Sequence, residues 1–234
     1  MMIYRADDRG LAEHGWLHSR FSFSFDQYHN PKRMGFGVLR VINDDAIEPE
    51  TGFGMHPHRD MEIITVVTRG AVEHKDSEGH HGITKAGQIQ YMSAGRGIYH
   101  SEFNPSKSEL LELFQIWIKP REKGLAPHYD QRDFSAFDDR NRWVALVSPD
   151  GREGSMAIAQ DAYISTARLD AGNTLVSRSL RSGNGRLLFV VEGEVFVGEQ
   201  LLMPRDEAQL SDEEEVVIRA NSAARVMVFD VPMR

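Results

Sequence analysis

Two short segments of the chain carry pairs of side chains that could bind a metal ion. His56 and His58 stand two residues apart, and His100 and Glu102 repeat this spacing later in the chain. In a β-strand, side chains at positions i and i+2 leave from the same face, about 6–7 Å apart. Imidazole nitrogens and carboxylate oxygens bind divalent metals at about 2 Å, so the members of a pair could share one ion. The two pairs together predict a single metal site.

Other interpretations of these residues are weaker but remain open. A lone His-Pro-His is more often a surface turn, and Pro57, which has no backbone N–H, favours a strand edge, start or bulge. The second pair makes the metal interpretation the stronger one. Glu62 could be a ligand, a hydrogen-bond partner behind the ligands, or a core residue. His74 and Asp76 repeat the spacing without a second pair, so we expect them at the surface.

The composition excludes several classes of protein. The 234 residues carry a net charge of −8, and they include no cysteine and no long run of Lys or Arg. Direct nucleic-acid binding through a basic patch is therefore not expected, and disulfides, iron–sulfur clusters and thiolate zinc sites are excluded. No segment approaches the ~18 apolar residues of a membrane helix, and the first residues lack the apolar region of a secretory signal. We expect a cytoplasmic monomer with no membrane partner.

The hydrophobic pattern predicts short β-strands throughout the chain. Runs rich in β-branched and aromatic residues at 62–68, 88–92 and 111–118 are separated by glycine-containing turns, which is typical of an all-β sandwich or barrel. Segment 21–25 alternates three Phe with two Ser, which predicts a half-buried strand with the Phe side chains in the core. The glycine-rich bend at 93–97 lacks the Lys-Ser/Thr ending of a phosphate-binding loop, so no nucleotide site is expected.

The second half of the chain repeats the first in outline. Segment 186–197 resembles segment 62–73 when Gly193 is aligned with Gly70. The residues that then stand opposite the histidine pair and Glu62 are not metal ligands: Ser179, Arg181 and Gly185. No histidine occurs in residues 129–234. The alignment predicts a duplicated β unit in which only the first copy holds a metal.

The polar segment 120–134, which contains two prolines, is the predicted linker between the copies. We expect an N-terminal domain at residues 1–125 that carries the metal site. A C-terminal domain without metal ligands is expected at residues 126–234. The acidic run at 212–215 is expected to be a solvated turn.

The segments around the ligand pairs resemble the sequence motifs of the cupins. The spacing His-X-His-X3-Glu at 56–62, together with Gly70, Gly87 and the residues 100–104, carries this resemblance. In finer detail the chain resembles bacterial pirins of the quercetinase type, at 34–45, 52–62, 92–102 and 115–118. The resemblance implies an all-β bicupin: two β-sandwich (jelly-roll) barrels that face each other, the first a cupin domain with a metal and the second cupin-like.

The resemblance to pirins also implies a metal and an activity. The ligands would be His56, His58, His100 and Glu102, and the ion Fe(II), with Zn, Mn, Co, Ni or Cu as possible substitutes. Several pirins of this kind open the central ring of quercetin with O2 and release CO, so a flavonol and O2 would be the substrates. Four protein ligands leave two positions of a six-coordinate ion open, as non-haem dioxygenases require. Two alternatives remain open: a non-catalytic metal or redox sensor that binds a protein partner, and another cupin chemistry, such as the isomerisation of a small substrate with Zn2+.

Within this dioxygenase hypothesis, individual residues have expected roles. Glu102 could take the proton of the flavonol hydroxyl as a general base. Glu62 would lie behind the ligands and orient an imidazole. The substrate pocket would be walled by apolar side chains, each of which could instead simply pack in the core: Phe36, Phe53, Met55 and Met92.

Overall fold

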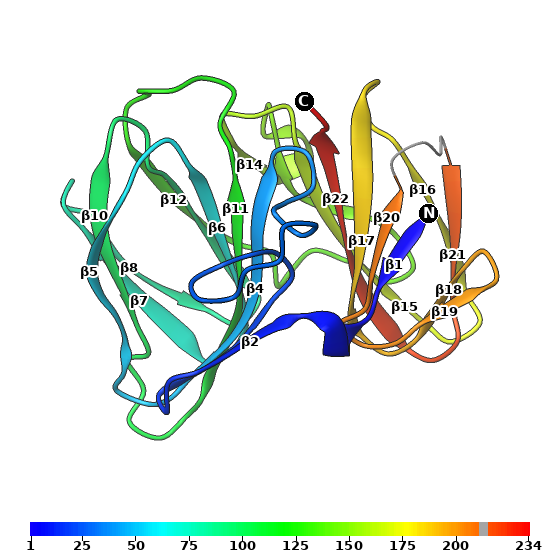
Figure 1. Cartoon of the computed structure of the whole chain (residues 1–234), viewed down its shortest axis with the longest axis horizontal. Coiled ribbons are helices and arrows are strands. Elements are labelled where there is room, and N and C mark those ends of the chain that lie inside the picture. The colour runs from blue at the N-terminus through cyan, green and yellow to red at the C-terminus, as the bar shows by residue number, and fades with distance from the viewer. Residues whose placement is uncertain (211–214) are drawn as a thin grey trace. The chain divides into compact units, whose positions relative to one another are not determined.

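Strands make up nearly all of the regular structure, as Figure 1 shows. The computed structural model describes residues 1–210 and 215–234, so most of the acidic run at 212–215 lies outside the described residues. The described chain divides into two compact units, one of residues 10–136 and one of residues 1–9 and 137–234. No helix among the described residues is both long enough and apolar enough to cross a membrane.

The first unit, residues 10–136, consists of two β-sheets with antiparallel pairing. Its strands are β2 (Gly10–Glu13), β3 (Leu17–Phe21), β4 (Leu39–Ile47), β5 (Gly52–His58), β6 (Glu62–Arg69), β7 (Ala71–Asp76), β8 (His81–Lys85), β9 (Gln88–Ser93), β10 (Ile98–Phe103), β11 (Leu111–Ile118) and β12 (His128–Asp133). A 7-stranded sheet has the order β12-β9-β6-β11-β4-β3-β2, and a 4-stranded sheet has the order β5-β10-β7-β8. The predicted sandwich of short strands is confirmed in this unit.

The core of the first unit lies between its two sheets. Val72 of the small sheet packs with buried side chains of the large sheet, among them Val67 and Leu113. Ile98 of the small sheet does the same with Ile63. Strand β6 is buried from Glu62 to Val67, which explains why β-branched residues fill this central strand almost without a break.

The second unit, residues 1–9 and 137–234, is also built from two sheets. Its elements are β1 (Met2–Tyr4), η1 (Ala6–Asp8), β13 (Val144–Ser148), η2 (Arg152–Gly154), β14 (Met156–Ala157), β15 (Tyr163–Leu169), β16 (Thr174–Arg178), β17 (Asn184–Glu192), β18 (Val195–Val197), β19 (Gln200–Leu202), β20 (Glu207–Leu210), β21 (Glu215–Ala220) and β22 (Ala224–Pro232). The sheet orders are β1-β20-β17-β22-β15-β13-β14 and β16-β21-β18-β19. The unit thus repeats the pattern of one 7-stranded and one 4-stranded sheet.

The two aligned glycines occupy the same kind of turn in both units. Gly70 joins β6 to β7 with φ +72°, and Gly193 follows β17 with φ +72°. A Cβ atom would lie 2.8 Å from the carbonyl oxygen of Leu110 at Gly70, and 2.1 Å from that of Ala223 at Gly193. Both the positive φ and the close approach of backbone require glycine, so the repeat seen in the sequence has a structural basis.

The structure differs from the sequence-based expectations at three places. Strand β12 pairs with β9, so the segment expected as a linker continues the first unit to residue 136. Strand β1 pairs with β20, so residues 1–9 belong to the second unit. The alternating segment 21–25 is not a strand: β3 ends at Phe21, and Ser22 and Ser24 are buried like Phe21 and Phe23, while Phe25 is only partly buried. The backbone N–H groups of the two serines donate to the carbonyl oxygens of Ile42 and Arg33.

Candidate metal centre

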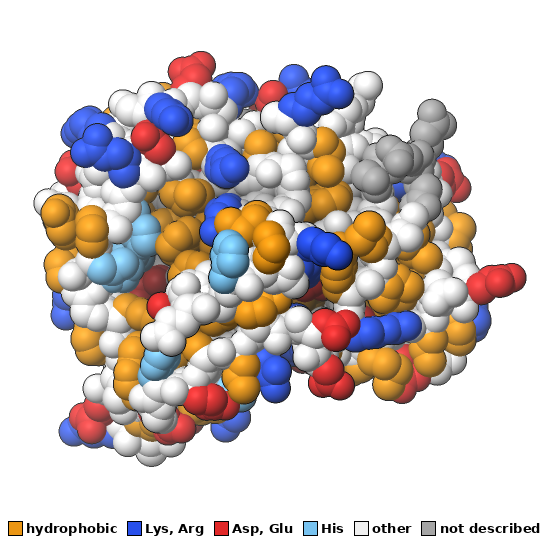
Figure 2. Space-filling view, in the orientation of Figure 1, with side chains coloured by type: hydrophobic (Ala, Val, Ile, Leu, Met, Phe, Trp, Pro, Cys, Tyr) orange, Lys and Arg blue, Asp and Glu red, His pale blue; other side chains and the backbone are white. Residues whose placement is uncertain are grey.

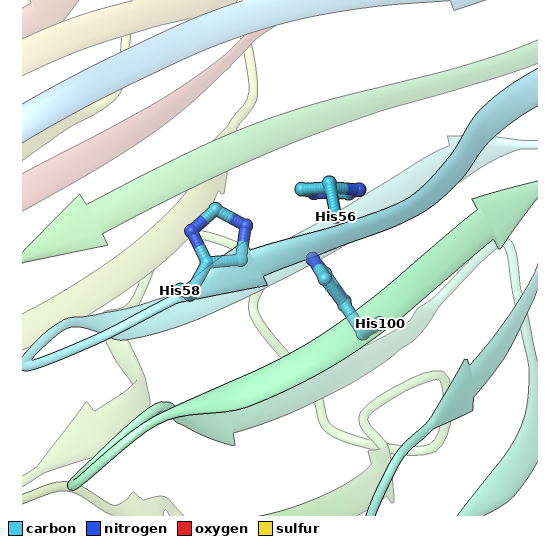
Figure 3. Close-up of side chains that lie close together, drawn as sticks. All are labelled: His56, His58 and His100. Carbon is cyan, nitrogen blue, oxygen red and sulfur yellow. The ribbon is translucent and has the colours of Figure 1, made fainter.

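Three histidines meet on the inner face of the small sheet in the first unit. Strands β5 and β10 pair so that His100 stands opposite His56, and His58 follows two residues further along β5. The ring centroids lie 4.4 Å apart for His56 and His100, and 4.8 Å apart for the two other pairs. Figure 3 shows the three imidazoles converging from the two strands. One ligand atom of each lies within 4.8 Å of the others, so the three histidines of the two spaced pairs form one cluster.

The hydrogen bonds of the rings leave nitrogen lone pairs for a metal. His56 Nδ1 lies 2.7 Å from the carbonyl oxygen of Gly54, which makes Nδ1 the donor and Nε2 the bare nitrogen. The Nε2 atoms of His58 and His100 are buried and have no hydrogen-bond partner among the residues that the structure describes. Buried polar atoms normally have a partner, so the unpartnered Nε2 atoms of His58 and His100 fit a cation bound in the cluster. The cluster is able to bind a metal.

The environment keeps two of these imidazoles neutral. Burial, with the neighbouring His56 as a further cause, lowers the pKa of His58 to about 4. Burial lowers the pKa of His100 to about 2, and His56, His58 and His74 add to this effect. Metal binding requires the neutral form of histidine, so both rings are ready to bind at neutral pH.

Glu102 lies beside the histidines in a buried, polar pocket of its own. It accepts hydrogen bonds from Thr65 at 3.2 Å and from Gln90 on one oxygen, and from Gln115 at 2.7 Å on the other. The Glu102 carboxylate forms a second potential metal-binding group with His74 and His100. It is not part of the group formed by the three histidines. Burial raises the pKa of Glu102, and nearby His74 and His56 and the hydrogen bonds oppose that rise.

Glu62, expected behind the ligands, points away from them. Along β6, Ile63 lines the cavity at the cluster and Thr65 bonds to Glu102, so the alternating Glu62 side chain leaves by the opposite face. Its carboxylate is buried and accepts hydrogen bonds from Tyr91 and from Ser93, the latter at 2.7 Å. Strand β5 ends at His58 and a separate strand starts at Glu62, so Glu62 does not continue the alternation of the two histidines.

His74 and Asp76, expected at the surface, have fully buried side chains. His74 Nε2 lies 3.0 Å from Asp76 Oδ2, and His74 Nδ1 lies 3.4 Å from His100 Nδ1. The signal was present in the sequence, because Val72, His74 and Asp76 share the inner face of β7 by alternation. Only the pairing of β7 with β10 shows that this face is the one that carries His100.

A cavity of about 720 Å³ opens on the histidine cluster. Figure 2 shows histidines beside a hollow that is bordered by hydrophobic side chains. The aromatic and aliphatic residues of the lining are Ala12, Trp16, Leu17, Phe21, Phe25, Phe53, Ile63 and Trp117. The cavity is large enough for a polycyclic aromatic ligand, and its shape and apolar lining are those of a small-molecule site.

Of the four side chains expected to wall the substrate, Phe53 alone lines this cavity. Met55 is 59% exposed on the other face of β5, and Met92 is buried in the core cluster with Ile63 and Ile98. Phe36 is buried in a short turn that bridges to Leu39. These three residues therefore do not contribute to the cavity.

Most of the aromatic lining comes from residues that sequence patterns assigned to packing or did not single out. Trp117 lies against His58, with ring centroids 4.8 Å apart, and Phe25 lies edge-on to Trp117 at 5.3 Å. Phe25, His58 and Trp117 are far apart in the sequence, so no local pattern predicts that their rings meet. The alternation of Phe and Ser at 21–25 predicts buried Phe side chains but does not predict that the serines are buried as well.

Comparison with known proteins places the site in a family context. Residues 5–118 match the family described as Pirin, and residues 145–231 match the family described as Quercetinase C-terminal cupin domain. The chain is 44% identical over 233 residues to a quercetin 2,3-dioxygenase of Escherichia coli K12, which covers 99% of both proteins. It is 41% identical over 225 residues to a pirin-like protein of Caulobacter vibrioides, covering 96% of both.

Among solved structures, the chain is similar to a bacterial pirin from Escherichia coli in complex with nickel(II). The TM-score is 0.93 at 43% identity, and the match covers 99% of both chains. A quercetin 2,3-dioxygenase from Acinetobacter baumannii, at 22% identity and a TM-score of 0.79, shares the fold. The expected all-β fold with two cupin-type domains is thus confirmed.

Proposed function

The chain belongs to the pirin family, and we propose that it is a metal-dependent dioxygenase that opens the central ring of a flavonol such as quercetin with O2 and releases CO. One observation carries this proposal: a cavity of about 720 Å³ with aromatic side chains in its lining opens directly on a cluster of three histidines that could hold a metal ion. Relatives named quercetin 2,3-dioxygenase that match over the full length of this chain support the same activity.

The proposed metal centre uses His56, His58 and His100, with Glu102 as the fourth ligand. Fe(II) is the proposed ion, and Zn, Mn, Co, Ni or Cu would fit the same nitrogen and oxygen donors; a similar pirin was solved with nickel(II). A divalent cation bound there supplies Lewis-acid activation of the flavonol hydroxyl and open positions for oxygen chemistry.

The protein's own groups would bind the flavonol and move its proton. Phe53, Phe25 and Trp117 would hold the flat rings between aromatic surfaces. The Trp117 indole N–H and Asn43 Oδ1 are buried without partners, so one donor and one acceptor are available to ligand hydroxyl and carbonyl groups. Satisfying these groups would fix the orientation of the ligand in the cavity.

Glu102 is the proposed general base for the flavonol hydroxyl. A carboxylate whose pKa is raised by burial takes up a proton readily once a hydroxyl group approaches it. Thr65, Gln90 and Gln115 would hold the carboxylate in place during this transfer, because all three donate to it from the large sheet.

Turnover by metal-loaded protein tests the proposal. Purified protein is stripped of metal, reloaded with Fe(II) or Ni(II), and mixed with quercetin, while flavonol absorbance and released CO are followed under O2 and under argon. We expect absorbance loss and CO only under O2 and only with metal. His100→Ala should abolish both signals, while the exposed His29→Gln should leave them unchanged. Metal-loaded protein that consumes no flavonol would overturn the proposal.

A second function, a metal-dependent sensor that binds a protein partner, is favoured by one observation. Met55, Tyr99 and Phe103 are exposed on strands β5 and β10, which carry the three histidines. A partner docked on this apolar face would contact the strands that hold the metal. Metal binding without quercetin turnover would fit this function.

A further inference from the structure

A chain of buried hydrogen-bonding groups runs from His100 into the small sheet. On the paired strands β7 and β10, Asp76 stands opposite His100, and His74 stands opposite Glu102. His100 Nδ1 lies 3.4 Å from His74 Nδ1, and His74 Nε2 lies 3.0 Å from Asp76 Oδ2. The side chains of His74 and Asp76 have no exposed surface, so water does not compete for these bonds.

Each hydrogen bond in this series determines which ring nitrogen of the next histidine carries the proton. The carboxylate of Asp76 only accepts, so His74 carries its proton on Nε2 and has a bare Nδ1. The bare Nδ1 of His74 only accepts, so His100 must carry its proton on Nδ1. The second nitrogen of His100, Nε2, is therefore the bare one, and like His58 Nε2 it is a buried atom with no hydrogen-bond partner among the described residues.

We infer that His74 and Asp76 are positioning residues that hold His100 in the tautomer able to bind the metal. The inference rests on the proposed metal centre and does not depend on the flavonol reaction. The Asp of the Ser-His-Asp triad acts by the same logic, since it holds the catalytic imidazole in the productive tautomer. Hydrogen-bond partners behind metal ligands commonly set ring orientation and basicity in this way.

The surroundings of Asp76 hold its two oxygens in different roles. The backbone N–H groups of Glu78 and His80 donate to Oδ1, at 3.0 and 2.9 Å. Oδ2 faces His74 Nε2 and also lies 3.0 Å from His80 Nδ1. Burial would raise the pKa of Asp76, but the hydrogen bonds from His74 and His80 outweigh it and bring the pKa below its usual value. The group is thus a fixed carboxylate.

This asymmetry makes Asp76→Asn an informative substitution. The two backbone N–H groups require an oxygen at the Oδ1 position, so the new amide NH2 takes the place of Oδ2 and faces His74 Nε2. His74 must then accept at Nε2 and carry its proton on Nδ1. His100 must in turn accept at Nδ1 and carry its proton on Nε2, where it blocks the metal. One atom exchange thus inverts both tautomers with almost no change in volume.

Nitrogen NMR of the imidazoles in metal-free protein reads these tautomers directly. In the wild-type protein we expect a protonated Nδ1 and a bare Nε2 for His100, and the reverse pattern for His74. In Asp76→Asn both patterns should invert. Because no metal is present, this measurement decides the tautomers even for a protein that proves inactive toward flavonols.

Calorimetric titration with Ni2+ measures the consequence for the metal. We expect Asp76→Asn to weaken Ni2+ binding by about 10–100-fold, the range typical of partners behind metal ligands. His74→Phe keeps a ring against Tyr129, whose centroid lies 4.5 Å from that of His74, and removes the acceptor for His100; it should weaken binding similarly. His74→Gln offers both an acceptor and a donor and should recover most of the affinity. Glu73→Gln, on the same strand, is the matched control.

The outcomes separate the inference from the proposed metal centre. Wild-type protein that binds no Ni2+ would contradict the metal centre, while the NMR spectra would still decide the tautomers. Wild-type affinity in both Asp76→Asn and His74→Phe would overturn the inference. So would weakened binding with the His100 tautomer unchanged, since the loss would then have a merely structural cause. If Asp76→Asn fails to fold, His74→Phe and His74→Gln carry the same comparison.

Discussion

Phe53 lies opposite Glu102 across strands β5 and β10, while His56 lies opposite His100. Three residue steps on β5 thus match two on β10, which is a β-bulge with one extra residue in β5. The bulge reverses the alternation, so the ring of Phe53 joins the histidines on the inner face and lies 6.3 Å from the His56 ring. The bulge therefore brings the Phe53 ring and the proposed metal ligand His56 to the same cavity.

Replacing Phe53 by Ala should weaken flavonol binding while the metal stays. The lost apolar contact, about 1.5–3 kcal/mol for a buried Phe, corresponds to a KM increase on the order of 10-fold or more. Steady-state kinetics and Ni2+ titration of the same preparation measure the two effects. Met55→Ala, on the exposed face of the same strand, is the control and should change neither. An unchanged KM in Phe53→Ala would show that the flavonol binds elsewhere.

Gly52→Ala should destabilise the protein and disturb the bulge. A Cβ atom at Gly52 would lie 2.2 Å from the carbonyl oxygen of Glu102 and 2.6 Å from Cα of Phe103, so the strands must separate. We expect a loss of about 1–3 kcal/mol in the free energy of unfolding, as for other overpacked positions. Urea denaturation measures it. Gly54→Ala is the matched control, because a Cβ atom there meets nothing within 4 Å.

Glu102 and Glu62 should respond differently to substitution by Gln. Glu102→Gln removes the proposed anionic ligand and base, so weaker metal binding and loss of turnover are expected. Glu62→Gln disturbs the bonds from Tyr91 and Ser93 on the other face of β6, which should lower stability by about 1–3 kcal/mol and leave metal affinity intact. Parallel metal titrations and denaturation curves test this pair. A metal lost in Glu62→Gln but kept in Glu102→Gln would reverse the assignment.

Acid should destabilise the metal-free protein. The pKa of His58 falls from an ordinary value of 6.5 to about 4, and that of His100 falls to about 2. Between pH 6.5 and 4 the unfolded chain therefore binds protons that the folded chain does not, so the free energy of unfolding must decrease as the pH falls. Each group contributes a slope of about 1.4 kcal/mol per pH unit.

Denaturation curves in the presence of a chelator, at several pH values in this window, measure the slope. His58→Gln should reduce it, and the exposed His29→Gln should not. A free energy of unfolding that stays constant from pH 6.5 to 4.5 would contradict the lowered pKa values of the cluster.

One metal ion should bind per chain. Both ligand groups found among the described residues lie within 56–102 and share His100, so they compete for a single ion. Elemental analysis of fully loaded protein should give about one ion per chain, the number a four-ligand site holds. Two tightly bound ions per chain would contradict this prediction and would require a metal site outside these two groups of residues.

The local features of this protein could be predicted from its sequence. Spacings of only a few residues define the His-X-His and His-X-Glu pairs, the strand-like runs and the turn glycines Gly70 and Gly193. Alternation and the backbone freedom of glycine act over the same short range. The histidines of the cluster, the all-β class and the duplication could therefore be inferred without a structure.

Tertiary structure decided the features that depend on strand pairing. The pairing of β7 with β10 turned His74 and Asp76 from expected surface residues into buried neighbours of His100. Because the strand breaks between β5 and β6, the Glu62 side chain lies on the face of the sheet opposite that of Thr65. Because of the bulge, Phe53 lines the cavity, while Met55 is exposed on the other face of β5. Register between strands is set by contacts far apart in the chain, and a shift of one residue moves a side chain to the other face of its sheet.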